Sequence, residues 1–237
     1  MFKKWLFILF VLGLIFACQK QEIKQYPLVY DFGYFPLDSG MWKHYDVTLI
    51  VIDVPSEVYD TTHYQLREVF AGWYLNAAND SMMRIERFMR DSSHHSWQPI
   101  SVWQSGIKSN DAFQIEENVK FLKIKFPVKF NNYWDGDAYN RLDTLKEYSY
   151  EITSLDVAEN INTINFDSVL TVTQKDKYSI IDKVYYFEKY AYGIGLVEKE
   201  QIYIYSDVED FDPTIPVEDR VTKGTLYYQK IIEYGKN

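Results

Sequence analysis

The chain has few of the residues on which many enzymes and metalloproteins depend. Its 237 residues include a single cysteine, Cys18, and four histidines. One cysteine cannot form an internal disulfide, and a thiolate metal site needs several, so both are excluded. The G-x-S-x-G elbow of serine hydrolases is absent, and no spacing marks a pair of carboxylates for acid–base catalysis. The sequence therefore favours a non-enzymatic protein without a cofactor, and a hydrolase is the weakest of the alternatives.

Positive charge is also in deficit. The chain has 25 basic and 34 acidic residues and a net charge of −9. Without Lys3 and Lys4, which belong to the N-terminal segment described next, 23 basic residues face 34 acidic ones, a net charge of −11. Such a surface repels phosphate backbones, so we expect no nucleic-acid partner and no polybasic face for membrane docking.

The one long apolar run lies at the N-terminus, where MFKK leads into residues 5–17 (WLFILFVLGLIFA). A bilayer-spanning helix needs about 20 apolar residues, whereas a secretory signal needs about 7–15 after a basic start. Ile15-Phe16-Ala17-Cys18 resembles a bacterial lipobox, which implies cleavage after Ala17 and acylation of Cys18. We therefore predict a signal peptide over 1–17 and an acylated cysteine with its tether over 18–30. The acyl chains would anchor the protein in the outer membrane, on its periplasmic or surface-exposed face.

The rest of the chain is rich in aromatic residues, with 21 Tyr, 15 Phe and 6 Trp in the full sequence. Aromatic and β-branched residues prefer strands, and period-two alternation recurs from residue 34 onward without a strong helical pattern. A sheet this long must curl or close to protect its edges. Residues 31–237 are therefore predicted to form a single all-β domain, a strongly curved antiparallel sheet shaped as an open or half barrel, with at most short helices.

Several local patterns support this fold. Residues 62–70 and 82–90 are expected to pair as a hairpin across NAANDS (76–81), although 82–89 would also fit a short helix. Residues 157–168 read as a loop or a short strand. Strict alternation over 122–130 predicts a strand, in which Pro127 marks a sheet edge or a strand end.

Two further patterns concern single positions. In residues 42–49 the expected core face carries Tyr45, Val47 and Leu49, while Lys43 is expected to be an exception to it. Gly193 and Gly195 lie on one face of a strand, where two missing side chains permit a sharp bend or the close approach of another backbone, and we predict the bend of a strongly curved sheet.

Three segments resemble patterns found in many lipoproteins of Bacteroidota. They are YFPLDSGMWKHYDV (34–47), NNYWDGDAYNRLDTLKEYSYEI (131–152) and FDSVLTVTQKD with YYFEKYAYGIGLVEKE (166–176 and 185–200). In the second pattern, W-D-G-N-x-Y-N, Asp137 stands where Asn is commoner. The resemblance implies a curved sheet similar to the open half-barrels of lipid and lipoprotein carriers. It carries no activity, and by fold-level analogy it suggests a concave face that binds a hydrophobic ligand or an envelope protein.

Metal-binding patterns in the sequence are weak. Asp207, Glu209, Asp210 and Asp212 form a weak calcium candidate, but EF-hand spacing fails because Phe211 takes the fifth position, and a solvated acidic turn is favoured. His94 and His95, near Asp91, could bind an ion together only in a loop, because adjacent strand residues point to opposite faces. Asp135 and Asp137 flank Gly136 in a D-G turn signal. We therefore predict no metal site.

Two possibilities remain open for the surface. Exposed tryptophans among Trp42, Trp73, Trp97, Trp103 and Trp134 could stack on sugars, so a carbohydrate-binding surface lipoprotein is the alternative function. Bacteroidota O-glycosylate exported proteins at triplets of Asp, then Ser or Thr, then an apolar residue or Thr. Four triplets here resemble that acceptor and make Thr61, Ser81, Thr144 and Ser168 candidate glycosylation sites.

Overall fold

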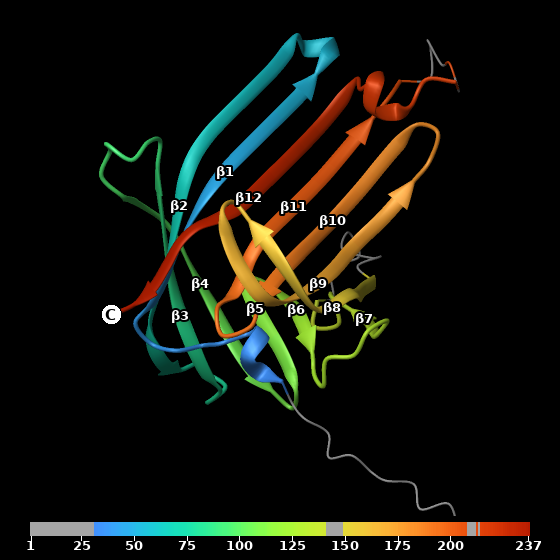
Figure 1. The fold of residues 1–237 in the computed structure, drawn as a ribbon. Coiled ribbons are helices and arrows are strands. Elements are labelled where there is room, and N and C mark those ends of the chain that lie inside the picture. The colour runs from blue at the N-terminus through green and yellow to red at the C-terminus, as the bar shows by residue number, and fades with distance from the viewer. Residues whose placement is uncertain (1–30, 141–148, 208–211, 213) are drawn as a thin grey trace, which may run out of the picture.

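The computed structural model describes residues 31–140, 149–207, 212 and 214–237, and most of them lie in strands. Twelve strands form one antiparallel sheet in the order β6-β5-β4-β3-β2-β1-β12-β11-β10-β9-β8-β7 (Figure 1). In chain order they are β1 Met41–Asp53, β2 Val58–Leu75, β3 Ser81–Arg90, β4 Gln98–Lys108, β5 Asp111–Glu116, β6 Val119–Lys125, β7 Tyr133–Asp135, β8 Ser149–Ile161, β9 Ile164–Tyr178, β10 Asp182–Ala191, β11 Gly195–Tyr205 and β12 Lys223–Lys236.

The helices within the described residues are short. Three turns of 3₁₀ helix occur there: η1 Phe32–Tyr34, η2 Val54–Ser56 and η4 Val217–Asp219. None of these turns has the length or the apolar character to cross a membrane. The predicted all-β fold, a strongly curved antiparallel sheet with at most short helices, is confirmed: the sheet curls into a nearly closed barrel (Figure 1).

Strands that follow one another in the chain lie side by side in the sheet, except β6 and β7. The first and last strands also meet, because β1 pairs with β12 along its whole length. The break in the ladder therefore falls in the middle of the chain, between β6 and β7, and we call it the seam. Short bonds bridge the seam: Trp134 Nε1 donates to the Leu122 carbonyl at 2.8 Å, and Leu122 N donates to the Gly136 carbonyl at 2.8 Å. Asn140 Nδ2 donates to the Lys120 carbonyl at 2.7 Å. The W-D-G-x-x-Y-N segment thus joins the two sheet edges.

Asparagine-containing two-residue turns explain several hairpins. The pairs Ser109-Asn110, Glu117-Asn118 and Asn162-Thr163 all have positive φ at both positions. A two-residue hairpin turn with the twist of the flanking strands requires that conformation, which Asn tolerates better than most residues. The third pair decides between the two alternatives for residues 157–168, a loop or a short strand: they are strand, as parts of β8 and β9 on either side of this turn.

Two expectations about local structure were wrong. Gly193 and Gly195 lie at and just after the turn between β10 and β11, with φ of +76° and +84°, so they end one strand and begin the next rather than bend a continuous strand. Lys43 is not an exception to the core face of β1, since it is 3% exposed beside buried Tyr45 and Val47.

Other local predictions are confirmed. Residues 62–70 and 82–90 pair as antiparallel strands within β2 and β3, which excludes the helical alternative for 82–89. Pro127 follows the edge strand β6. The strand signal over 122–130 ends early, however: Leu122, Ile124 and Phe126 are buried, whereas Phe130 is 62% exposed.

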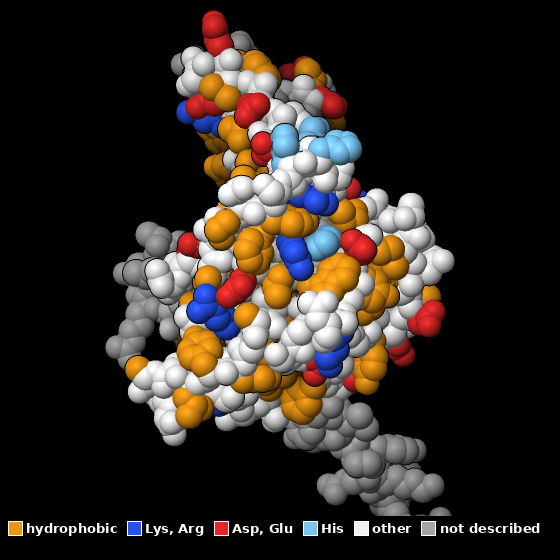
Figure 2. All heavy atoms as spheres, turned by 90° about the vertical axis from the view of Figure 1, so that its left-hand side faces the viewer, with side chains coloured by type: hydrophobic (Ala, Val, Ile, Leu, Met, Phe, Trp, Pro, Cys, Tyr) orange, Lys and Arg blue, Asp and Glu red, His pale blue; other side chains and the backbone are white. Residues whose placement is uncertain are grey.

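One end of the sheet projects beyond the barrel. In Figure 1 the adjoining ends of β2, β1, β12, β11, β10 and β9 continue upward as a single layer past the other strands. Seen from the left of that view, this sheet extension rises as a narrow column above a wider body, with hydrophobic side chains open to solvent on both (Figure 2). A sheet normally buries one face against another element, so a single layer with apolar residues is a candidate contact surface.

Candidate functional site

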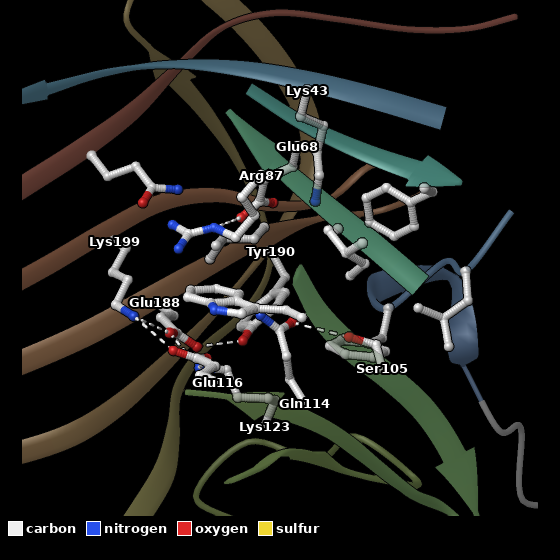
Figure 3. Close-up of a pocket in the computed structure, with 18 of the residues that line it drawn as sticks. Lys43, Glu68, Arg87, Ser105, Gln114, Glu116, Lys123, Glu188, Tyr190 and Lys199 are labelled. Atoms are coloured by element: carbon white, nitrogen blue, oxygen red, sulfur yellow. Dashed lines mark hydrogen bonds and ion pairs between the residues drawn. The ribbon is translucent and has the colours of Figure 1, made fainter. Parts of the chain in front are cut away.

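Charged side chains from seven strands meet around a cavity inside the barrel (Figure 3). This central cavity has a volume of about 40 Å³. Its charged lining consists of Lys43 (β1), Glu68 (β2), Arg87 (β3), Glu116 (β5), Lys123 (β6), Glu188 (β10) and Lys199 (β11). Each side chain points inward through strand alternation, and charges this deep in a protein are costly unless they are paired.

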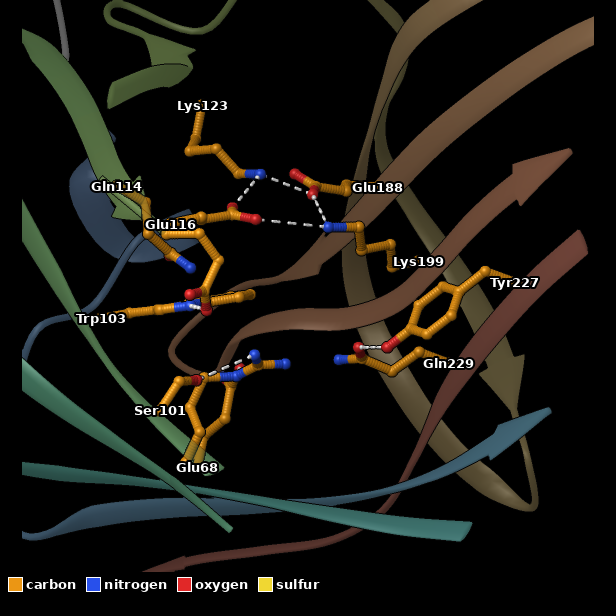
Figure 4. Close-up of polar contacts among 12 residues, drawn as sticks. Glu68, Ser101, Trp103, Gln114, Glu116, Lys123, Glu188, Lys199, Tyr227 and Gln229 are labelled. Carbon is orange, nitrogen blue, oxygen red and sulfur yellow. Dashed lines mark hydrogen bonds and ion pairs between the residues drawn. The ribbon is translucent and has the colours of Figure 1, made fainter. Parts of the chain in front are cut away.

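Four of these residues form a ring of alternating charge, which we call the charge ring. Lys123 Nζ lies 2.6 Å from Glu188 Oε1 and 2.9 Å from Glu116 Oε1. Lys199 Nζ lies 3.5 Å from Glu188 Oε1 and 3.6 Å from Glu116 Oε2 (Figure 4). The register sets part of this geometry, because Glu188 and Lys199 face each other on β10 and β11. The ring therefore links the β5–β6 wall to the β10–β11 wall with no net charge.

The charge ring keeps both of its carboxylates ionised. Burial alone would raise the pKa of Glu116, but the ammonium groups of Lys123 and Lys199 outweigh it and lower that pKa to about 2. The same balance lowers the pKa of Glu188, which also accepts a hydrogen bond from the Tyr190 hydroxyl. Burial would lower the pKa of Lys123, but Glu116 and Glu188 raise it. At neutral pH these carboxylates act as acceptors and not as general acids.

A second neutral unit is the Glu68–Arg87 pair. Arg87 Nε lies 3.3 Å from Glu68 Oε1, and the Tyr45 hydroxyl donates to Glu68 Oε2 at 3.4 Å. The guanidinium carbon of Arg87 also lies 3.4 Å from the centre of the Trp103 ring, a cation–π contact that holds its plane. Burial and the Glu68 carboxylate together raise the pKa of Tyr45 well above its ordinary value, so its proton stays in this bond.

Lys43 is the remaining charge and is held differently. Its side chain reaches into the cavity from β1, and its ammonium lies 5.0 Å from the centre of the Phe70 ring (Figure 3). Among the residues that the structure describes, none makes a hydrogen bond or an ion pair with Lys43 Nζ. Burial lowers the pKa of Lys43, against the opposing fields of Glu68 and Glu188.

The size and lining of the central cavity bear on what it can hold. A water molecule needs about 10–15 Å³ of cavity volume on this scale, so the cavity has room for about three waters. Pockets for drug-sized or lipid-sized ligands are about 300–1,000 Å³ and mostly apolar. The described interior of the barrel is thus filled largely by its own side chains, with a polar centre.

A different feature lies on the sheet extension. Ile50, Leu226, Ile202 and Tyr185 face one another in register across β1, β12, β11 and β10. All four are partly exposed, and this apolar row contains no charge. The register continues the row to Thr61 on β2 and to the carboxylate of Asp176 on β9. Tyr59 and Tyr178, 70% and 60% exposed, lie two positions further along those strands. Apolar and aromatic side chains inside a polar rim are typical of protein interfaces.

The weak metal candidates that fall in the described part of the chain include exposed side chains of turns and connections. Asp207 is exposed, and Asp212 accepts bonds from the Thr214 backbone at 2.9 Å and from the Thr214 hydroxyl at 2.6 Å, as in a capped turn. Glu209 and Asp210 lie outside the described residues. His94 and His95 are exposed in the β3–β4 connection. Within the described ranges, no three His, Cys, Asp or Glu side chains are placed to hold a metal ion.

The candidate modification sites have different surroundings. Thr61 and Ser81 are exposed on strands, whereas the hydroxyl oxygen of Ser168 lies 2.6 Å from that of buried Tyr34. Thr144, Cys18 and Ala17 lie outside the described residues, so glycosylation and lipidation remain predictions.

The tryptophans divide between core and surface. Trp103 and Trp134 are buried, at 8% and 6% exposure. Trp73 is 50% exposed and borders an open groove with Tyr74, Arg84 and Gln104. The His44 ring lies 4.7 Å from the ring of Trp42 and 5.1 Å from that of Trp97, centre to centre.

The sequence prediction missed the central cavity, although part of its signal was present. Lys43 precedes Tyr45 and Val47 on the core face of β1, and Glu68 stands between Leu66 and Phe70 on that of β2. A charged residue that interrupts an alternation of apolar residues either marks the end of a strand or is itself buried. A second interruption of the same kind, on the strand that pairs with the first, favours the interpretation that both charges are buried.

Comparisons with known proteins add two distant likenesses. No protein-family model and no curated protein matches the chain. A solved exported protein with a YmcC-like fold from Bacteroides fragilis is 11% identical, with a TM-score of 0.44, covering 85% of this chain and 98% of its own. A lipoprotein from Parabacteroides distasonis is 10% identical, with a TM-score of 0.41 and the same coverage. These TM-scores are too low to support an argument about the ligand or partner of this chain.

Proposed function

We propose that this protein is a non-enzymatic lipoprotein, anchored in the outer membrane through acylated Cys18, that docks a protein of the cell envelope on the apolar row. The row is the observation that carries the proposal. It is a strip of four partly exposed apolar side chains across four strands of a sheet extension, with Thr61 at one end and Asp176 at the other. The filled interior favours docking over storage of a lipid inside the barrel.

Site-specific photocrosslinking in the native host tests the docking surface. A photoreactive phenylalanine analogue replaces Ile202 in the apolar row, and the matched control replaces Tyr203, whose side chain points to the opposite face of the same strand. We expect one crosslinked partner from position 202 and none from 203. The partner should be lost when Leu226→Lys places a charge in the row beside Ile202.

Other outcomes of this experiment would contradict the proposal. Equal crosslinking from both positions would show a non-specific surface. An adduct of twice the mass of the chain would assign the row to self-association, and the absence of any adduct would remove the docking role.

Native mass spectrometry of the mature protein, with lipid extraction of the same sample, tests the alternative of a bound hydrophobic ligand. We expect the mass of the acylated protein alone, because a cavity of about 40 Å³ has no room for an acyl chain. A further mass that extracts into organic solvent would favour a carrier instead.

A carbohydrate-binding surface is a second candidate, favoured by half-exposed Trp73 beside Arg84 and Gln104 in an open groove. An aromatic ring next to hydrogen-bonding side chains is suited to a sugar. Retention on immobilised polysaccharide should then be lost in Trp73→Ala and kept in Ile100→Ala, a similarly exposed residue outside the groove lining.

A further inference from the structure

The charges that line the central cavity do not cancel. The charge ring combines two lysines with two glutamates, and the Glu68–Arg87 pair is also neutral. Lys43 is left over, 3% exposed, and none of the described residues provides it with a hydrogen bond or an ion pair. A buried ammonium without a counter-charge is costly, so the folded protein gains from anything that supplies one.

Hydrogen-bonding groups around the cavity show the same imbalance. Gln229 from β12 lines the cavity and is 2% exposed. Its Oε1 accepts a hydrogen bond from the Tyr227 hydroxyl at 2.6 Å, while its buried Nε2 has no acceptor within the described residues (Figure 4). Lys43 Nζ and Gln229 Nε2 are both donors. The cavity is therefore short of one acceptor group and of one negative charge.

From this imbalance we infer that the central cavity is a binding site for one small monovalent anion, with Lys43 as its counter-ion. A volume of about 40 Å³ limits the anion to a halide or a carboxylate of one or two carbons. The anion would bring the net charge of the lining to zero. The inference is independent of the docking role of the sheet extension.

Thermal unfolding of the full mature protein in detergent tests the site. Melting is followed in sodium chloride and in sodium formate against sodium gluconate, a larger anion, at constant ionic strength and pH 7.5. A tenfold excess of a bound anion over its Kd should raise Tm by about 3–6 °C. Lys43→Met should abolish this rise, and Lys223→Met, which removes an exposed charge outside the cavity, should keep it.

The direction in which Lys43→Met shifts Tm in the absence of a small anion separates an anion-binding role of Lys43 from a purely structural one. In gluconate, Lys43→Met should melt at or above the wild-type temperature, because it removes an unpaired buried charge. Gln229→Glu offers a second variant, since it adds a carboxylate to the lining; its Tm should not respond to chloride or formate. If Lys43→Met melted lower by the same amount in every salt, Lys43 would be a packing residue and the inference would be wrong.

A crystallographic measurement keeps the test decisive if a variant does not fold. Crystals of the wild-type protein soaked in sodium bromide should show an anomalous peak inside the cavity near Lys43 Nζ. Water-like density at that position, without an anomalous signal and without a salt-dependent Tm, would mean that water fills the cavity and that the inference is wrong.

Discussion

Asp137 is a carboxylate in an unfavourable position, and its replacement by asparagine should stabilise the protein. It is 7% exposed in the turn that follows β7, beside the seam. Its Oδ2 is buried with no hydrogen-bond partner, and its Oδ1 receives only a long bond of 3.5 Å from Asn140 among the described residues. Burial raises the pKa of Asp137 to about 6, and the neighbouring Asp135 carboxylate adds to the rise.

The magnitude follows from proton linkage. In the unfolded chain this carboxyl titrates near 3.8, and in the folded protein near 6. The folded state therefore binds the proton more tightly, and this group costs nothing below about pH 4. As the pH rises from about 4 to above 6, the folded state loses up to about 3 kcal/mol relative to the unfolded state. Asp137→Asn removes that loss because the amide does not ionise.

Urea denaturation at a series of pH values measures the effect. The free energy of unfolding of Asp137→Asn should exceed that of the wild type by about 1–3 kcal/mol at pH 7.5, and the difference should vanish near pH 4. Asp135→Asn is the matched control at the same turn, and its gain should be smaller, because it removes the neighbouring charge but leaves the Asp137 carboxyl buried, which is the larger cause of the raised pKa. A difference of the same size at both pH values, or none at pH 7.5, would refute the reasoning.

Three further predictions concern the charge ring, the seam and the anchor. Lys123→Met should destabilise the fold by about 3–5 kcal/mol in urea, because the two buried carboxylates of Glu116 and Glu188 would then share one ammonium, that of Lys199, at 3.6 and 3.5 Å. It should also flatten the loss of stability that the wild type shows as the pH falls from 4.5 towards 2, since the lowered pKa of Glu116 depends on this lysine. Gly136→Ala should cost about 1–3 kcal/mol by calorimetry, because its Cβ would lie 2.5 Å from the Tyr150 ring and strain the seam. Cys18→Ser should abolish acylation, and the variant should leave the detergent phase in phase partitioning; continued acylation would overturn the lipobox interpretation.

Much of the fold could be predicted from the sequence because it depends on patterns among residues that are close together in the chain. Alternation located the β2–β3 hairpin, and the aromatic content with the absence of a helical period indicated a curled antiparallel sheet. The wrong or undecided predictions of strand ends concern positions where one or two residues decide whether a strand continues or the chain reverses. The chain reverses through positive φ at Asn162-Thr163 and again at Gly193. Neither turn contains Asn-Gly, the dipeptide that most strongly indicates a two-residue hairpin.

The central cavity was harder to predict from the sequence because it forms only when the sheet closes into a barrel, which no local pattern shows. Its charged residues come from strands as far apart in the chain as β1 and β11, and a lysine or glutamate on a strand usually marks the solvent face. Only when the seam closes do Lys123 and Glu188, 65 positions apart, come within 2.6 Å. The W-D-G segment that bridges the seam therefore also holds the β6 wall of the charge ring in place. Loosening the seam should then weaken the anion site without any change to Lys43, and Gly136→Ala, made to test stability, should also reduce the salt-dependent rise in Tm.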